Sequence, residues 1–250
     1  MIKDGVGITN NINSFLMIGQ SNMCGRGDIG DVEEIVNNDC FMLRMGRWQP
    51  MSEPINVDRA IKGIEFPSGV CLTASFADEL NKKTGDKIGL IPCADGGTKL
   101  SQWMPGELNY DHAVYMSRLA MRTSSLKAIL WHQGESDCEQ DEDVNTYKEK
   151  FIKMITALRK ELGNPSLPVI IGELCENMGK RWNVEDRPKK LNKIFYEIEK
   201  ELPFCKVVSA KGLKLKDDRL HFNSESLRIF GKRYFEKYME LENDKYSQVF

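Results

Sequence analysis

The sequence predicts an α/β fold, a three-layer α/β/α sandwich with a mostly parallel central sheet. One observation on the sequence and one general rule of sheet packing lead to this prediction. Short apolar runs alternate along the chain with longer segments whose apolar residues recur at helical spacing. Parallel strands need crossover helices, and strands that are apolar on both faces need helices on both faces. The length of 250 residues suits one large domain, so we expect residues 1–250 to form a single domain.

A strand is expected wherever a short apolar run ends in small or polar residues. The run at residues 15–18 stops at Gly19-Gln20-Ser21-Asn22, which places Ser21 at a strand end. In α/β proteins the carboxyl ends of strands open into the crevice where ligands bind, so this hydroxyl is expected to face a substrate. Taken alone, Ser21 also fits a cap of the following turn. The other strands that we expect cover residues 40–45, 87–92, 128–131, 168–174 and 206–209.

Helices are expected where apolar residues recur with helical spacing and a glycine or proline marks an end. The strongest such pattern covers residues 144–162, and Gly163 follows it as a stop. Residues 49–66 include Pro50 and Pro54 and are expected to form a long irregular connection that becomes a wall of the active site. The other helices that we expect cover residues 67–84, 110–126, 188–202 and 224–241.

The charge balance argues against nucleic acid and membrane surfaces as partners. Lys and Arg together number 35 and Asp and Glu 37, so the net charge of −2 provides neither a basic surface nor a polybasic anchor. The first residues lack the apolar core of a secretory signal, and no apolar run approaches the roughly 18 residues needed to span a bilayer. We therefore expect a cytoplasmic protein.

The sequence contains no pattern typical of a metal or cofactor site. The seven cysteines are scattered without a C-x-x-C pair, which predicts reduced core thiols and argues against disulfides or a zinc knuckle. No two histidines are one helical turn apart, and the acidic run at residues 137–143 lacks calcium-loop spacing and fits a helix N-terminus. The glycine-rich residues 25–30 lack a phosphate or dinucleotide fingerprint. We expect neither a metal nor a cofactor.

Four segments of the chain resemble the conserved blocks of one hydrolase superfamily. Gly19-Gln20-Ser21-Asn22-Met23 is similar to the nucleophile block of SGNH/GDSL hydrolases, in the form found in the sialate O-acetylesterase and acetylxylan esterase group, carbohydrate esterase family 6. The other segments follow in the expected order at residues 94–103, 131–137 and 218–222. The resemblance extends over most of the chain. It implies a flavodoxin-like winding of the sheet and a serine esterase.

A serine hydroxyl needs a base to take its proton as it attacks an acyl carbon. The chain contains three histidines, and His221 is our candidate base because it lies in a loop after a predicted strand. Asp218 precedes His221 by three residues, close enough to hold the imidazole tautomer and stabilise its positive charge. His112 begins a predicted helix without a partner, and His132 is expected to make a structural hydrogen bond.

Glu135 is a second candidate for the acidic partner of His221. It lies two residues after Gln133, and an equivalent Glu is sometimes assigned this role in the esterase group that the chain resembles. We favour Asp218 because it is local to His221. The roles of Ser21 and His221 are the same under either assignment.

The tetrahedral intermediate of acyl transfer needs hydrogen-bond donors for its oxyanion. Three candidates occur at predicted strand ends: the backbone N–H of Ser21, the backbone N–H of Gly97 or Gly96, and the side-chain amide of Gln133. Their chain order matches the blocks of the superfamily. Most SGNH enzymes have Asn at the position of Gln133, and the sialate esterase-like group typically has Gln, whose longer side chain changes the reach of the donor.

The residues themselves predict acyl transfer, and the resemblance implies that an acetylated sugar or oligosaccharide is the substrate. Gln20, Asn22 and Gly96 flank the catalytic candidates and are expected to contact that substrate. Trp103 is expected either to stack on a sugar ring or, as we favour, to pack in the core. Two alternatives are a lipase-like or thioesterase GDSL hydrolase, which would prefer long acyl chains, and a catalytically silent carbohydrate-binding protein of the same fold.

Overall fold

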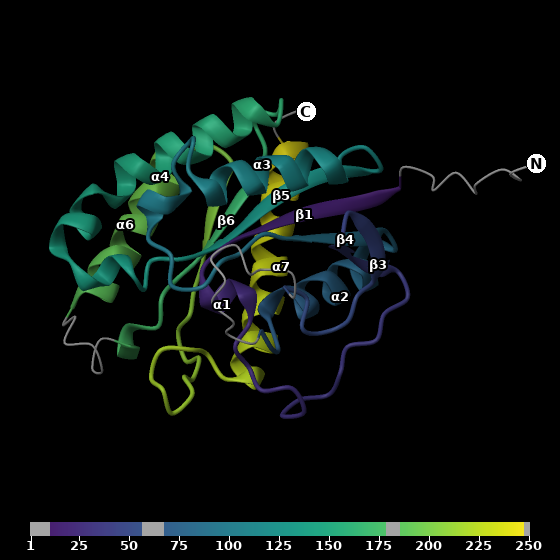
Figure 1. The fold of residues 1–250 in the computed structure, drawn as a ribbon, viewed down its shortest axis with the longest axis horizontal. Helices are drawn as coiled ribbons and strands as arrows, with labels where there is room; N and C mark the ends of the chain where they lie inside the picture. The colour runs from purple at the N-terminus through teal and green to yellow at the C-terminus, as the bar shows by residue number, and fades with distance from the viewer. Residues whose placement is uncertain (1–10, 57–67, 179–185, 248–250) are drawn as a thin grey trace, which may run out of the picture.

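The computed structural model describes residues 11–56, 68–178 and 186–247. Within these residues, the central sheet contains seven strands in the order β3-β2-β4-β1-β5-β6-β7 (Figure 1). All neighbours pair in parallel except β2 and β3, which are antiparallel. The strands are β1 (Ile12–Gly19), β2 (Cys40–Arg44), β3 (Arg47–Pro50), β4 (Lys87–Pro92), β5 (Ser124–His132), β6 (Val169–Gly172) and β7 (Cys205–Val208).

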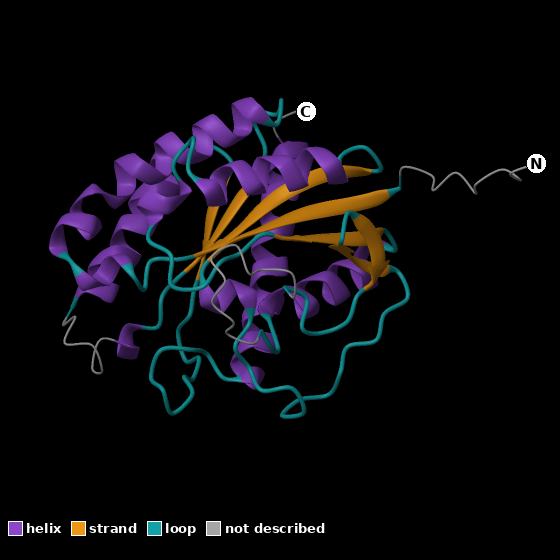
Figure 2. Cartoon of the chain, viewed as in Figure 1, coloured by secondary structure: helices purple, strands orange, loops and turns teal. Residues whose placement is uncertain are grey.

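Helices cover both faces of the sheet, as Figures 1 and 2 show. Helices α3, α4 and α6 lie on one face, and α1, α2 and α7 lie on the other. The predicted three-layer fold is confirmed. The α-helices are α1 (Ser21–Cys24), α2 (Leu72–Thr84), α3 (Leu108–Ala120), α4 (Asp141–Glu161), α6 (Arg187–Glu201) and α7 (Ser224–Ser247), with short 3₁₀ turns η1 (Leu100–Trp103), η2 (Asp137–Glu139) and η3 (Glu176–Met178).

Strand β1 lies in the middle of the sheet and contributes to both halves of the core. Leu16 and Ile18 belong to the cluster under α3, α4 and α6, whereas Phe15 and Met17 belong to the cluster under α2 and α7. All four side chains are fully buried, and burying a side chain of this size contributes about 2 kcal/mol to stability. The alternation follows from the two-residue period of a strand, and it explains why the run is apolar at every position.

The order of the parallel strands places a ligand crevice at the end of β1. Strands β4 and β5 lie on opposite sides of β1 in the sheet, so the chain reverses its direction of winding at β1. This is the flavodoxin-like winding that the resemblance implies. In open α/β sheets such a reversal leaves a crevice beyond the carboxyl ends of the two strands concerned. The residues that follow β1 and β5 therefore meet at this point.

The predicted helix at residues 110–126 is wrong at its C-terminal end. Helix α3 stops at Ala120, and β5 begins at Ser124, where it pairs with Ile12 of β1. The Ser124 hydroxyl donates to Ala120 O at 2.8 Å and lies 2.9 Å from Ser14 Oγ, so this polar residue is satisfied inside the sheet. The polar start of β5 concealed its extended conformation from an argument based on apolar runs.

The predicted irregular connection at residues 49–66 is also corrected at its start. Arg47–Pro50 forms β3, which pairs with β2 through a hairpin whose turn residues are Met45 and Gly46. Both turn residues have positive φ, 49° and 74°, as a two-residue hairpin of matching twist requires. Pro50 is tolerated because it ends an edge strand. Residues 57–66 of the predicted active-site wall lie outside the described residues.

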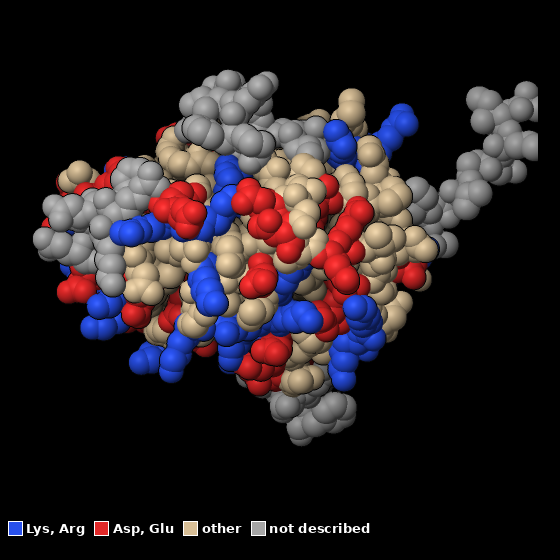
Figure 3. All heavy atoms as spheres, turned by 90° about the horizontal axis from the view of Figure 1, so that it is seen from below, with Lys and Arg blue, Asp and Glu red and all other residues tan. Residues whose placement is uncertain are grey.

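Acidic and basic side chains are interspersed over the face shown in Figure 3. None of the helices that the structure describes is both long and apolar enough to cross a bilayer. All seven cysteines are buried, in agreement with their predicted packing role.

Candidate active site

Ser21 lies where β1 ends and α1 begins. Gly19 has a φ of 131°, and a Cβ there would collide with the backbone carbonyl of His132. Only glycine allows β1 to approach β5 this closely. The next residue, Gln20, donates its backbone N–H to that carbonyl at 2.9 Å. The sheet therefore holds the backbone of the nucleophile candidate on its N-terminal side.

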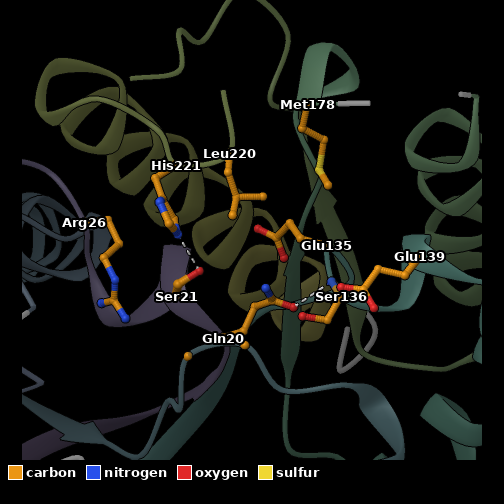
Figure 4. Close-up of a pocket in the computed structure, with 11 residues that line it drawn as sticks. Gln20, Ser21, Arg26, Glu135, Ser136, Glu139, Met178, Leu220 and His221 are labelled. Carbon is orange, nitrogen blue, oxygen red and sulfur yellow. Dashed lines mark hydrogen bonds between the residues drawn. The ribbon is translucent and has the colours of Figure 1, made fainter. Parts of the chain in front are cut away.

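The loop before α7 brings His221 to Ser21 (Figure 4). His221 Nε2 is 2.9 Å from Ser21 Oγ, and His221 Nδ1 is 2.7 Å from Asp218 Oδ2. Asp218 Oδ1 accepts the backbone N–H groups of Leu220 and His221 at 2.8 and 2.9 Å. Arg219 inside this turn has a positive φ of 56°, an uncommon conformation for a residue other than glycine. One carboxylate thus shapes the turn and contacts the imidazole.

The pKa of Asp218 is lowered by its surroundings. Partial burial acts to raise it, but the backbone N–H groups of His221 and Leu220 and the His221 ring outweigh that effect. The carboxylate is consequently ionised near neutral pH, as a group that stabilises an imidazolium must be.

Glu135, the alternative partner, is bonded to other groups. Its Oε1 atom accepts Asn22 Nδ2 at 2.6 Å and lies 3.2 Å from His132 Nε2. Burial acts to raise the pKa of Glu135, but the His132 ring and the hydrogen bonds from His132 and Asn22 hold it below its ordinary value. The structure therefore pairs Glu135 with His132 and pairs His221 with Asp218.

The side-chain amide of Gln133 faces the protein interior. It is fully buried, and its Nε2 donates to Asp137 Oδ2 and, at 2.9 Å, to Thr98 O. Its Oε1 accepts the Tyr147 hydroxyl at 2.8 Å. Burial raises the pKa of Asp137 to about 6. The expectation that Gln133 donates to the oxyanion is corrected, because both amide hydrogens have acceptors within the protein.

The amide of Gln20 faces the pocket in its place. Gln20 Oε1 accepts the backbone N–H groups of Gly134 at 3.4 Å and Ser136 at 3.3 Å, and it lies 3.2 Å from Gln133 Nε2. Backbone N–H groups can only donate, so these contacts fix which end of the amide is oxygen. The nitrogen then points toward Ser21 and the pocket (Figure 4).

Two glycines after β4 also line the pocket. Gly96 and Gly97 follow β4, and Gly97 has a φ of 70°, which favours glycine. Among the described residues, neither Gly97 N–H nor Ser21 N–H donates to a protein acceptor. Ser21, Gly97 and Gln20 all line the pocket.

The pocket has a volume of about 280 Å³ and opens to solvent. Its wall combines the candidate catalytic groups with polar and apolar side chains from later in the chain. It is lined by Gln20, Ser21, Arg26, Gly96, Gly97, Glu135, Ser136, Glu139, Met178, Leu220 and His221. Within the described parts of the chain, no three His, Cys, Asp or Glu side chains are arranged to hold a metal ion.

A family model described as a carbohydrate esterase, sialic acid-specific acetylesterase, matches residues 11–240. The chain belongs to this carbohydrate esterase family. A curated relative, a probable carbohydrate esterase of Arabidopsis thaliana, is 32% identical over 231 residues, which cover 85% of this chain and 84% of the relative.

Solved structures agree on the fold. The structure of a protein from Arabidopsis thaliana superposes with a TM-score of 0.83 at 28% identity, covering 93% of this chain and 99% of that one. The structure of NanS gives a TM-score of 0.75 at 15% identity, covering 94% and 99% of the two chains. A lipase/acylhydrolase from Enterococcus faecalis shares the SGNH hydrolase fold at a TM-score of 0.53 and 15% identity, covering 90% and 95%.

Two residues of this carbohydrate esterase that were expected to contact substrate do not line the pocket. Trp103 is buried, donates its indole N–H to Thr98 Oγ1 at 3.0 Å and packs edge-on against Trp131. It belongs to the core, as favoured above. Asn22 is also buried, and its amide is bonded within the protein.

The remaining histidines have structural surroundings. His132 is fully buried between the rings of Phe222 and Phe230, in agreement with the expected structural hydrogen bond. Burial lowers the pKa of His112.

Five pocket residues of the esterase were missed by sequence reasoning. Arg26 lies in the glycine-rich stretch and Glu139 in the acidic run, neither of which carries a pattern that predicts a substrate site. Ser136 and Leu220 lie inside two of the four superfamily-like segments without a predicted role, and Met178 lies outside all four. They reach the pocket because η2, η3 and the His221 loop end beside it.

Proposed function

We propose that this protein is a serine esterase that removes O-acetyl groups from a carbohydrate through an acyl-enzyme. The observation that carries the proposal is the chain of contacts from Ser21 Oγ to His221 Nε2 at 2.9 Å and from His221 Nδ1 to Asp218 Oδ2 at 2.7 Å, open to a pocket. Membership of a carbohydrate esterase family supports ester hydrolysis as the reaction and a carbohydrate as the substrate.

In the first half-reaction Ser21 Oγ attacks the carbonyl carbon of the ester. Its proton passes to His221 Nε2, and Asp218 stabilises the resulting imidazolium through Nδ1–H. The tetrahedral intermediate then collapses and breaks the bond to the sugar oxygen. That oxygen takes the proton from His221 Nε2 and leaves as an alcohol, so the acetyl group remains on Ser21.

The second half-reaction runs the same steps with water. His221 Nε2 takes a proton from water as the water oxygen attacks the acetyl carbon. Collapse of the second tetrahedral intermediate breaks the bond between the acetyl carbon and Ser21 Oγ, which takes the proton back from His221 Nε2. The product is acetic acid, which ionises to acetate in solution. Both intermediates place a negative oxygen in the same space, so one set of donors serves both.

The donors assigned to that oxygen are the backbone N–H groups of Ser21 and Gly97 and the side-chain amide of Gln20. Each of these residues lines the pocket, and the Gln20 amide is pre-oriented by the two backbone N–H groups that donate to its oxygen. Pre-oriented donors need no reorganisation when charge develops, and the loss of one typically costs about 3–4 kcal/mol of transition-state stabilisation.

The polar side chains on the pocket wall suit a hydroxylated leaving group. Arg26 and Glu139 lie on opposite sides of Ser21 and Gln20 in Figure 4, and Ser136 lies beside Glu139. Sugar hydroxyls both donate and accept hydrogen bonds, so they match a wall that carries both a cation and an anion. The family description supports acetylated sugars, including sialic acids, as the substrate class.

Hydrolysis of p-nitrophenyl acetate, butyrate and octanoate tests the acyl group. We expect acetate to be preferred, Ser21→Ala to abolish turnover, and Ser101→Ala, an exposed serine of η1, to retain it. Turnover that survives Ser21→Ala would contradict the serine mechanism, and a preference for octanoate would favour a lipase-like enzyme. Release of acetate from acetylated sialic acids, acetylated xylan and simple sugar acetates then identifies the carbohydrate.

A further inference from the structure

Asn22, the residue after Ser21, holds the backbone on both sides of His221. Its Oδ1 accepts the N–H of Phe222 at 3.0 Å, and its Nδ2 lies 3.3 Å from the carbonyl oxygen of Leu220. Asn22 is 1% exposed. One buried amide therefore connects the residue next to the nucleophile with the two neighbours of the base, across a separation of about 200 residues in sequence.

Glu135 determines which way this amide is oriented. A carboxylate accepts hydrogen bonds, and Glu135 Oε1 accepts Asn22 Nδ2 at 2.6 Å. The backbone N–H of Phe222 can only donate, so it requires Asn22 Oδ1 at the other end. His132 Nε2, 3.2 Å from the same Glu135 oxygen, holds the carboxylate in turn. The amide consequently has one orientation that satisfies every partner.

We propose that Asn22 and Glu135 are positioning residues that fix His221 Nε2 at hydrogen-bond distance from Ser21 Oγ. Glu135 acts through Asn22 and leaves the His221 ring to Asp218. This inference rests on the proposed serine esterase function. It gives the buried carboxylate of the pocket a role other than that of acidic partner of the base.

The loop that carries His221 needs such a support. The side chains of His221 and Asp218 are partly exposed, so less packing surrounds them than surrounds a core residue. Proton transfer requires donor and acceptor within about 3 Å, and a displacement of about 1 Å can cost about 100-fold in rate. Because Asn22 is the neighbour of Ser21 in the chain, its hydrogen bonds to the backbone beside His221 fix the position of the base relative to the nucleophile.

A double-mutant cycle on p-nitrophenyl acetate tests the proposal. We expect Asn22→Ala to lower kcat by about 100-fold and Glu135→Gln, which keeps an acceptor but loses the charge, to lower it by roughly tenfold. KM should stay within about threefold in both. Once Asn22 is gone, Glu135→Gln should add less than about twofold, because its effect passes through the missing amide.

Asn192→Ala is the matched control for Asn22→Ala. Asn192 is a buried amide that accepts Leu174 N at 2.8 Å and donates to Leu174 O at 3.0 Å, so it makes the same kind of backbone clamp away from His221. We expect a similar loss of thermal stability, with kcat kept within about threefold. Equal losses of kcat in the two variants would reduce Asn22 to a merely structural residue and overturn the proposal.

The pH profile of kcat/KM separates the two roles of Glu135. A positioning role leaves the acid limb, which reports the free-enzyme base, in place in Glu135→Gln. A shifted acid limb, or losses that multiply in the double variant, would make Glu135 a direct partner of His221 and overturn the proposal. Ser21→Ala is measured in parallel. If this variant keeps its activity, the proposed serine esterase mechanism fails, whatever the results for Asn22 and Glu135.

Discussion

The His221–Asp218 pair and the His132–Glu135 pair each join an imidazole to a carboxylate three residues away, but the surroundings of the two pairs differ. The side chains of His221 and Asp218 are 19% and 33% exposed, whereas those of His132 and Glu135 are 0% and 3% exposed. In the first pair the other ring nitrogen faces Ser21 Oγ. In the second pair the ring is enclosed by aromatic side chains.

The two glutamines of the site differ in the same way. Gln20 presents its amide nitrogen to the pocket, and Gln133 directs its own to Asp137 and Thr98 behind it. The site therefore contains a layer of groups that face the pocket and a buried layer of similar groups that hold them. Residue type alone does not show to which layer a side chain belongs, whereas its hydrogen-bond partners do show it.

Substitution of each histidine should separate the layers most strongly. His221→Gln is expected to lower kcat/KM by about 10⁴-fold or more and to leave thermal stability nearly unchanged, because it removes the base from a partly exposed loop. His132→Gln is expected to cost roughly 1–3 kcal/mol of stability and less than about tenfold in rate, because it disturbs a buried hydrogen bond. Steady-state kinetics and thermal unfolding of both variants check this. The opposite ranking in kcat/KM would contradict the assignment of the layers.

Substitution of Asp218, which contacts His221, should lower kcat more than substitution of the buried Glu135. The difference between the two should be smaller than the difference between the two histidines. Asp218→Asn is expected to lower kcat by about 10³-fold, because an amide at this position favours the wrong tautomer of His221. Glu135→Gln is expected to lower it roughly tenfold, as argued for its action through Asn22. Parallel kcat measurements on p-nitrophenyl acetate decide between them. A larger loss for Glu135→Gln would transfer the role of acidic partner to Glu135.

Gln20→Glu sharpens the comparison of the glutamines. This substitution keeps an acceptor for Gly134 N and Ser136 N but replaces the pocket-facing donor by an anion, so kcat should fall about 10²–10³-fold with little change in stability. Gln133→Ala should instead lower stability by roughly 1–3 kcal/mol and cost less in kcat. A greater loss of kcat for Gln133→Ala would return the oxyanion role to Gln133.

The smallest expected effect concerns the pH dependence of stability in the buried layer. The pKa of Glu135 is lowered in the fold, so its stabilisation is present above its ordinary pKa of 4.5 and is lost as the pH falls. The pKa of Asp137 is raised from 3.8 to about 6, so its contribution decreases as the pH rises through that window. Urea unfolding at several pH values should show a shallower acid loss in Glu135→Gln and the opposite change in slope in Asp137→Asn. Identical slopes in the two variants would contradict these directions.

The parts of the site that lie close together in sequence could be predicted from sequence. Ser21 follows a strand, and Asp218 precedes His221 by one turn, so local rules place each of them. The role of Gln20 could not be predicted, because the orientation of its amide depends on donors more than one hundred residues away. Asn22 was assigned to the substrate for the same reason.

The fold shows the same limit. Apolar runs predicted the buried strands, whose side chains pack on both faces. The edge strand β3 is only half-buried, so its sequence lacks that signal. Strand β5 begins with Ser124, a buried polar residue whose hydroxyl contacts Ser14 and Ala120. Elements whose stability depends on turns or on polar contacts between distant segments were the ones misplaced.

The central claim is that Ser21 is acylated during turnover and that His221 activates it. Rapid acid quench of the enzyme with p-nitrophenyl acetate, followed by peptide mass spectrometry, tests this directly. We predict one added acetyl group on the peptide that contains Ser21, formed in wild type and absent in Ser21→Ala and His221→Gln. Full turnover with no acetyl group on Ser21, or acetylation at the same rate without His221, would contradict the account.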